Sequence, residues 1–416
     1  MPTNLTNAPH TTSKKIMHIN QLSQDAGVLI CGHGSRAKIA EREFSLLAKG
    51  LRARFPELKV EYGFLEYSAP NIHMALDSLV AQGVKKIYAV PGMLFAATHA
   101  RNDIPSVLTT YKEKHPGLEI EYGKELGLHQ EMINAFQARI LEAATGSTEL
   151  PANGSLYDTM LVTVGRGTSV TEANAEAAKL TRIVCENLGF GWAETVYSGV
   201  TYPSVGRGLE MAVKLGFKKI VVAPYFLFGG RLIDRIHGYI DKVAAENPDI
   251  TFLKADYLRD QSHVINTFIE RINDTINGDV TNASNGVSLM QDFKDRLARG
   301  EVNVHHHHAE FQPEDKEFQP EDKEFQPEDK KLQPEITDPL DDEASPTHTH
   351  SHKHSHAQKH SHSHAPYKHI GHPQGPRTMI NDNICCCFMG QFPQHIIDEE
   401  KAIKGELPGT PSCKRS

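Results

Sequence analysis

The sequence predicts an α/β protein made of two duplicated, Rossmann-like parallel-sheet domains followed by a disordered, histidine-rich C-terminal tail. Strand and helix patterns alternate over residues 27–145, and the same order recurs over residues 157–275. The segment GVKKIYAVP at 83–91 also matches GFKKIVVAP at 216–224, 133 residues further along the chain. Alternating strands and helices call for a parallel sheet covered by helices. A repeated match at one offset indicates an internal duplication.

Short apolar runs and helical periodicity predict the elements of the first domain. The run GVLIC at 27–31 ends in Gly-His-Gly, which is typical of a buried parallel strand that enters a turn. The next stretch places four apolar residues on one helical face before Pro56 ends the helix. The remaining elements are strands at 59–67, 85–92 and 118–123 and helices at about 71–82, 99–114 and 129–144.

The duplication and the composition divide the chain into five parts. These are a disordered N-terminus at 1–25, a catalytic half at 26–147, a degenerate half at 157–278, an acidic repeat linker with a histidine-rich low-complexity tract at 279–376, and a cysteine-containing segment at 377–416. The linker repeats Glu-Phe-Gln-Pro-Glu-Asp-Lys three times in tandem. Such an acidic, proline-punctuated repeat cannot bury a core, so we expect no order after about residue 280.

Charge and cysteine usage exclude several classes of protein. Residues 309–345 contain 14 acidic residues and 4 lysines, a net charge of −10. Because the whole chain has a net charge of −8, the remaining residues have a net charge of about +2. A nearly neutral folded part offers no basic face for nucleic acid. No secretory core occurs in the first 25 residues, and no apolar run approaches the roughly 20 residues that span a bilayer. Six cysteines, three of them consecutive, do not form a disulfide framework and favour a reducing cytoplasm.

Three potential ligands follow successive strands of the first half: His33, Glu66 and His99. Because the carboxyl ends of parallel strands meet at one edge of a sheet, we expect these side chains to converge. The matching positions of the second half are Arg166, Thr201 (after a small gap) and Leu232. The second copy therefore kept its fold and lost its ligands, which is expected if one half does the chemistry and the other closes a pocket.

Two imidazoles and a carboxylate suit a borderline divalent ion such as Co²⁺, Ni²⁺, Fe²⁺ or Zn²⁺. Neutral histidine also accepts protons near pH 7, and metal insertion into a macrocycle needs both capacities. Other interpretations stay open. A histidine in a glycine-rich turn can be structural, Glu66 can be merely solvated, and Gly-His-Gly-Ser before a helix can cradle an anion. Arg36 and Arg101 either bind an acidic substrate or are plain surface charges.

The motifs themselves resemble a known family. Gly-His-Gly-Ser-Arg at 32–36, Phe-Leu-Glu at 64–66 and Thr-His-Ala-Arg-Asn-Asp-Ile-Pro at 98–105 are similar to the sirohydrochlorin cobaltochelatases, class II chelatases of cobalamin synthesis. The resemblance covers about residues 26–275 of a long, two-domain form. It implies a chelatase fold that inserts Co²⁺ without ATP into a tetrapyrrole held in the interdomain cleft.

The resemblance also implies roles for single residues. His33 and His99 would bind the metal and accept the pyrrole protons, and Glu66 would help to capture the ion. The acidic macrocycle would be bound by Ser35, Arg36 and Arg101. In the second half, Phe226 and Phe228 either pack against its face or belong to the core, and core is the commoner place for aromatic residues.

The C-terminal tail carries two further metal-binding patterns. His305–His308 form a run, and eight histidines between 348 and 364 mostly alternate with small or basic residues, which predicts a multidentate ligand for divalent ions. The alternative is a low-complexity tract without function. Cys385–Cys387 are contiguous and so fit an iron–sulfur cluster poorly, although some long-form relatives carry one. A redox-labile or inert segment is the alternative.

Three other functions remain to be weighed against a cobalt chelatase. The first is the same reaction with Fe²⁺ or Ni²⁺, and the second is a metal-storage protein or metallochaperone that works through the tail. The third, a dinucleotide-binding protein, is disfavoured because the chain has no Gly-x-Gly-x-x-Gly.

Overall fold

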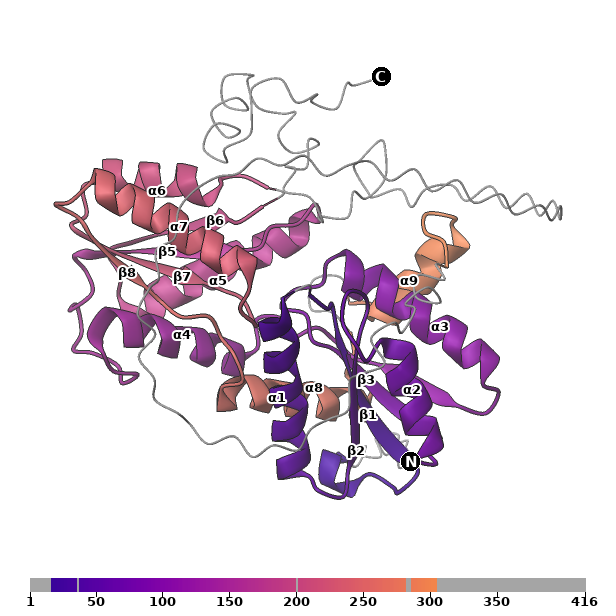
Figure 1. The fold of residues 1–416 in the computed structure, drawn as a ribbon. Helices are drawn as coiled ribbons and strands as arrows, with labels where there is room; N and C mark the ends of the chain where they lie inside the picture. Colours follow the sequence, from indigo (N-terminus) through magenta and orange to yellow (C-terminus); the bar gives the residue numbers. More distant parts are fainter. Residues whose placement is uncertain (1–15, 36, 200, 282–285, 305–416) are drawn as a thin grey trace, which may run out of the picture. The chain divides into compact units, whose positions relative to one another are not determined.

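The computed structural model describes residues 16–35, 37–199, 201–281 and 286–304, and they adopt the α/β architecture that the sequence predicts. These residues contain two four-stranded parallel sheets, with strand orders β2-β1-β3-β4 and β6-β5-β7-β8 (Figure 1). The first sheet comprises β1 (Ala26–Gly32), β2 (Lys59–Phe64), β3 (Lys86–Pro91) and β4 (Glu119–Tyr122). The second comprises β5 (Thr159–Gly165), β6 (Trp192–Tyr197), β7 (Lys219–Pro224) and β8 (Thr251–Lys254).

Helices connect the strands in both repeats. The first repeat contains α1 (Lys38–Arg54), α2 (Ile72–Ala81), the π-helical segment η2 (His99–Asp103), α3 (Ile104–Lys114) and α4 (Gln130–Thr145). The second contains α5 (Thr171–Leu188), α6 (Val205–Lys214), α7 (Arg231–Glu246) and α8 (Ser262–Asn277). None of the helices in the described residues is both long and apolar enough to cross a membrane.

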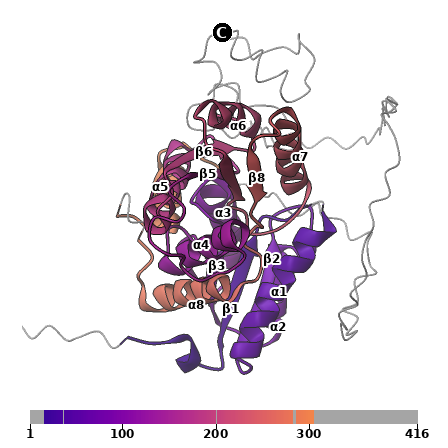
Figure 2. The same ribbon diagram turned by 90° about the vertical axis from the view of Figure 1, so that its left-hand side faces the viewer.

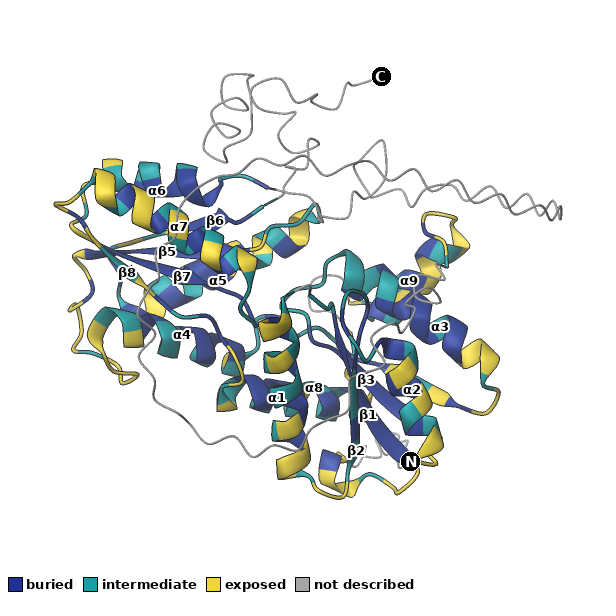
Figure 3. Ribbon diagram, in the orientation of Figure 1, coloured by how far each residue is buried: buried dark blue, intermediate teal, exposed yellow. Residues whose placement is uncertain are grey.

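Burial explains why the central strands are continuous apolar runs. All seven residues of β1 and of β5 are buried, because helices cover both faces of each sheet (Figure 3). The outer strands β4 and β8 include exposed residues, as expected at the edges of a sheet. The apolar runs at 27–31 and around 159–165 therefore mark the middle of the two sheets.

The two repeats exchange their last helices. Helix α4, from the first repeat, packs against β7 and β8 of the second sheet, whereas α8, from the second repeat, packs against β3 and β4 of the first (Figure 2). The ring of Phe136 on α4 lies 5.0 Å from the ring of Tyr225, which follows β7. In the other direction, Arg271 on α8 donates to the carbonyl of Leu126 at 2.8 Å. One apolar core consequently contains residues of both sheets.

This exchange separates the sequence repeats from the units of packing. The expected parts 26–147 and 157–278 follow the duplication, but neither part contains all the helices that cover its own sheet. Sequence periodicity could not reveal the difference, because an exchanged helix has the same apolar face as one that stays with its own repeat.

The expected disorder at both ends is wrong for the residues that the structure describes. Residues 16–25 include a short 3₁₀ helix, η1 (Ile19–Gln21), and Ile19 is buried. The backbone of Met17 and Ile19 bonds to Asn277 and Asn273 of α8. Beyond residue 280 the chain forms α9 (Leu289–Ala298). Ser288 caps this helix, and the side chains of Leu289 and Phe293, one helical turn apart, are both buried. The acidic repeats that follow had dominated the composition of this region.

Candidate metal-binding site

His33, Glu66 and His99 follow β1, β2 and β3, and the loops bring them to one edge of the first sheet. The turn after β1 depends on Gly34, whose φ is 93°. A Cβ atom at this position would lie 1.6 Å from the carbonyl oxygen of Glu66. Glycine therefore permits the first loop to approach the second, and the Glu66 amide donates to the His33 carbonyl at 3.1 Å.

The three side chains converge as the sequence predicts. The rings of His33 and His99 stand edge to face, with centroids 4.2 Å apart and an interplanar angle of 86°. Nε2 of His33 lies 3.5 Å from Oε1 of Glu66. One potential ligand atom from each of the three residues lies within 4.8 Å of the others, which makes this the one such group among the described residues. Two imidazoles and a carboxylate at this separation fit a single divalent ion.

Hydrogen bonds to Nδ1 set the orientation of both imidazoles. Nδ1 of His33 lies 3.0 Å from the Gly34 carbonyl, and Nδ1 of His99 lies 2.6 Å from Oδ2 of Asp103. Because a carbonyl or carboxylate oxygen only accepts, each Nδ1 is the protonated nitrogen of the neutral ring. Each Nε2 then carries the lone pair that a metal ion needs.

Asp103 is a functional residue that the sequence reasoning missed. It lies one helical turn after His99, on the same π-helical segment. Carboxylates that hold the second nitrogen of a metal-binding histidine fix its tautomer and raise its basicity. The i, i+4 spacing of a histidine and an aspartate in the segment between β3 and α3 was the signal that could have revealed it.

Burial and neighbouring positive charge keep His33 neutral. Burial lowers the pKa of His33 well below its usual value, and the charges of His99 and Arg166 lower it further. The hydrogen bond to the Gly34 carbonyl opposes this shift only in part. Neutral imidazole is the form that binds metal and accepts protons, so His33 is prepared for both at neutral pH.

A cavity of about 330 Å³ opens in front of these side chains. His33, Ser35 and His99 line it from the first repeat. From the second repeat the lining includes Arg166, Asn174, Tyr225, Phe226, Phe228 and Leu232. Phe226 is only 8% exposed and belongs to the core of the second repeat, and Phe228 packs against Phe44, yet both line the cavity. Packing of either ring against a macrocycle remains a prediction.

The structure corrects one of the three positions that were matched between the repeats. Arg166 and Leu232 line the cavity at the places of His33 and His99. The counterpart of Glu66, however, is Gly199 and not Thr201. The Leu65 amide bonds to the Gly32 carbonyl and the Ser198 amide bonds to the Gly165 carbonyl, so Glu66 and Gly199 follow equivalent residues at the same offset of 133. No gap is needed.

Arg166 places a positive charge beside the candidate metal ligands. It replaces a histidine in the second repeat, but its charge acts on both His33 and Glu66 of the first. The second repeat thus contributes a cation to the site as well as an apolar wall.

The residues expected to bind an acidic macrocycle differ in position. Ser35 lines the cavity, although its amide donates to Ser68 Oγ and its own Oγ accepts from the Ala37 amide. Those bonds occupy two groups that an anion cradle would use. Arg101 lies 3.2 Å from Asp292 of α9 and lines a second cavity of about 550 Å³. Arg36 lies outside the described residues.

The tail predictions also fall outside the described residues. These are the acidic repeats, the histidine-rich tract and Cys385–Cys387 with the possible iron–sulfur cluster. They remain predictions.

Two repeated α/β domains with a pair of imidazoles and a carboxylate at the strand ends define a class of two-domain, metal-binding α/β protein. The chain belongs to the CbiX family, whose model matches residues 27–143 and 160–275. It is 34% identical over 254 residues to the sirohydrochlorin cobaltochelatase of Priestia megaterium, covering 61% of this chain and 81% of that protein. It is 27% identical to the sirohydrochlorin ferrochelatase of Bacillus subtilis over 60% of this chain and 91% of that protein.

Solved structures show the same fold. SirB from Bacillus subtilis with Fe³⁺ aligns with a TM-score of 0.53 and 26% identity, covering 64% of this chain and 99% of SirB. SirB of Bacillus subtilis subspecies spizizenii in complex with cobalt aligns with a TM-score of 0.50 and 25% identity, covering 60% of this chain and 95% of that chain. The predicted chelatase fold is therefore confirmed for the two repeats.

Proposed function

We propose that this protein is a metal chelatase that inserts Co²⁺ into a sirohydrochlorin-type tetrapyrrole. The observation that carries the proposal is the convergence of one ligand atom each from His33, Glu66 and His99, beside a cavity that both imidazoles line together with Phe226 and Phe228. The names of the relatives support it, since they are sirohydrochlorin chelatases for cobalt or for iron.

The chemistry of insertion balances with the groups at hand. Nε2 of His33, Nε2 of His99 and a carboxylate oxygen of Glu66 hold the incoming ion. The macrocycle then presents its pyrrole nitrogens, two of which carry protons. As metal–nitrogen bonds to the ring form, the bonds to the protein break and the two pyrrole N–H bonds are lost. The two imidazoles, freed of the ion, accept those two protons and pass them to solvent.

Cobalt is favoured over iron by the relatives rather than by the ligand set. The cobaltochelatase is the more similar of the two relatives, at 34% against 27% identity. Imidazole and carboxylate ligands do not discriminate sharply among Co²⁺, Fe²⁺ and Ni²⁺. Iron is the next metal to consider because other relatives are named ferrochelatases, and nickel follows.

The cavity lining suggests how an acidic, flat substrate would be bound. Phe226 and Phe228 offer aromatic surface to the ring face, and Arg166 offers a cation to a carboxylate. We propose Ser35 and Arg36 as binding residues because they follow His33 in the sequence motif Gly-His-Gly-Ser-Arg. Arg101 would have to bind the substrate while its guanidinium is paired with Asp292.

Anaerobic incubation with sirohydrochlorin and each of Co²⁺, Fe²⁺ and Ni²⁺ tests the proposal through the absorption change on insertion. We expect insertion to be fastest with Co²⁺. His33→Ala and His99→Ala should each lower kcat by about 100-fold or more while they unfold at the wild-type temperature, because each removes a ligand and a proton acceptor. Wild-type rates in both variants would end the proposal.

A storage or metallochaperone function is the second candidate, because the tail contains so many histidines. Truncation after Val304 distinguishes the two. A chelatase should keep its turnover and need more free metal, whereas a storage protein would lose nearly all of its bound ions in equilibrium dialysis.

A further inference from the structure

Helix α9 lies beyond the part of the chain that the family model matches, which ends at residue 275. It nevertheless packs against η2 and α3, the segment that begins with His99. Leu289 joins the core cluster that contains Ile104 and Val107. An element outside the family fold thus touches the segment that carries a candidate metal ligand.

The η2 segment needs hydrogen-bond donors that its own backbone cannot supply. In a π-helix the carbonyl of Ala100 pairs with the amide of residue 105, and in an α-helix the carbonyl of Arg101 does so. Residue 105 is a proline and has no N–H. Whichever pattern the turn follows, the carbonyl that would pair with residue 105 therefore needs a donor from elsewhere in the fold.

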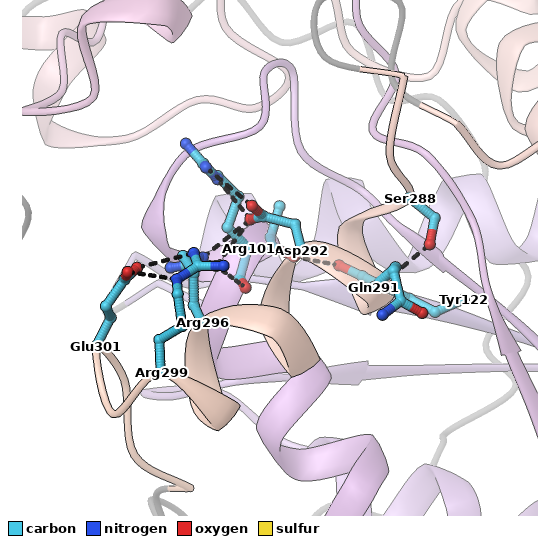
Figure 4. Close-up of polar contacts among 9 residues, drawn as sticks. Arg101, Tyr122, Ser288, Gln291, Asp292, Arg296, Arg299 and Glu301 are labelled. Carbon is cyan, nitrogen blue, oxygen red and sulfur yellow. Dashed lines mark hydrogen bonds and ion pairs between the residues drawn. The ribbon is translucent and has the colours of Figure 1, made fainter.

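Two side chains donate hydrogen bonds to the carbonyls of Ala100 and Arg101. Tyr122 donates its hydroxyl to the Ala100 carbonyl at 2.9 Å, and Nη2 of Arg296 on α9 donates to the Arg101 carbonyl at 2.8 Å (Figure 4). Tyr122 belongs to β4 of the family fold, whereas Arg296 comes from α9 alone. One of the two bonds that complete η2 thus depends on the added helix.

The Asp292 carboxylate bridges the guanidinium groups of Arg101 and Arg296. Its carboxylate lies 3.2 Å from Nε of Arg101 and 3.0 Å from Nε of Arg296 (Figure 4). Arg296 is only 4% exposed, and a buried guanidinium remains charged at acceptable cost only when it is paired. Asp292 therefore keeps Arg296 aimed at the backbone of η2 and anchors the side chain of Arg101 from the same segment.

We propose that α9 is a clasp that fixes η2, and that Asp292 and Arg296 are positioning residues for His99 and Asp103. The proposal rests on the proposed function in one respect, namely that His99 binds the metal. Loss of the clasp would let η2 shift and would move Nε2 of His99 away from Nε2 of His33 and the Glu66 carboxylate. Small displacements of this kind strongly reduce both metal affinity and turnover.

Asp292→Asn and Arg296→Met, made in the full chain, test the clasp. Asp295→Asn is the matched control, because Asp295 lies exposed on the same helix and accepts from Gln291. We expect each test variant to bind Co²⁺ about 10-fold more weakly, as loss of groups behind metal ligands does elsewhere. The absorption bands of bound Co²⁺ should change and kcat should fall in both test variants. In Arg296→Met, KM for the tetrapyrrole should stay within about twofold because Arg296 does not line the cavity beside His99. The control should match wild type.

Hydrogen exchange separates this proposal from the proposed function. The amides of residues 99–104 and 106 should exchange faster in Asp292→Asn than in Asp295→Asn, whatever reaction the protein performs. Wild-type exchange, Co²⁺ affinity and kcat in Asp292→Asn would overturn the clasp. If the wild-type protein inserts no metal, the proposed function fails, and exchange and Co²⁺ spectra still decide the clasp. If Arg296→Met does not fold, Asp292→Asn, which is nearly isosteric, gives the decision.

Discussion

Asp103 determines which nitrogen of His99 can bind a metal. Its carboxylate holds Nδ1 at 2.6 Å and leaves Nε2 for the ion. Asp103→Asn removes the charge that fixes this tautomer, so we expect Co²⁺ affinity at the site to fall by about 10-fold or more. Titration of the Co²⁺ absorption bands measures the change. Asp249→Asn, which affects an exposed carboxylate paired with Lys218, should bind Co²⁺ as wild type does.

The positive charge of Arg166 should influence how Co²⁺ binding depends on pH. The pKa of His33 lies below its usual value because of burial, and also because of the charges of His99 and Arg166. Only neutral imidazole binds the ion, so His33 should still be able to bind Co²⁺ as the pH falls below 6.5 and should be protonated only at lower pH. Arg166→Ala removes one cause of the low pKa, and the pH at which binding is half lost should therefore rise. Affinities measured from about pH 5 to 8 test this, and an unchanged midpoint would contradict it.

At the scale of elements, the loop after β1 depends on a single glycine. Gly34→Ala imposes a positive φ on alanine and drives Cβ against the Glu66 carbonyl. We expect a loss of about 2 kcal/mol or more in the free energy of unfolding, together with weaker Co²⁺ binding. Gly83→Ala is the control, because Gly83 also has a positive φ but faces open space. Urea unfolding of both variants separates the steric clash with the Glu66 carbonyl from the cost of the positive φ. Equal losses in the free energy of unfolding would show that the clash contributes nothing.

The central strands could be predicted from sequence because they are continuous apolar runs, and most of the helices because their buried positions repeat with the helical period. Strand β1, expected at 27–31, runs from Ala26 to Gly32, and the helix expected at 129–144 is α4. The convergence of His33, Glu66 and His99 followed from the rule that parallel strands end at one edge. What periodicity could not predict depended on particular partners: Asp103 acts through one hydrogen bond, and α9 is short and precedes a long acidic repeat.

At the scale of the whole molecule, the exchange of α4 and α8 predicts how a fragment behaves. Five of the six buried positions of each helix have the same spacing: 132, 133, 135, 136 and 140 in α4, and 264, 265, 267, 268 and 272 in α8. The sixth differs, being Leu141 in α4 and Thr275 in α8. A fragment of residues 16–147 lacks α8 but has an equivalent apolar face in α4. We therefore expect it to form a dimer in which each copy covers the first sheet of the other with α4.

Sedimentation equilibrium of this fragment checks the expectation. A shorter fragment, residues 16–128, lacks both helices and should neither dimerise nor unfold cooperatively. A folded monomer of residues 16–147 would show that α4 can turn back onto its own sheet.

The same exchange has a consequence for the order in which the chain matures on the ribosome. The sheet that carries the ligand residues is translated first, but the helix that closes its apolar face, α8, ends only at Asn277. Until that point has left the exit tunnel, the earlier strands expose a surface that later chain must cover. We expect the nascent protein to acquire a metal-ready centre late, after both repeats have emerged.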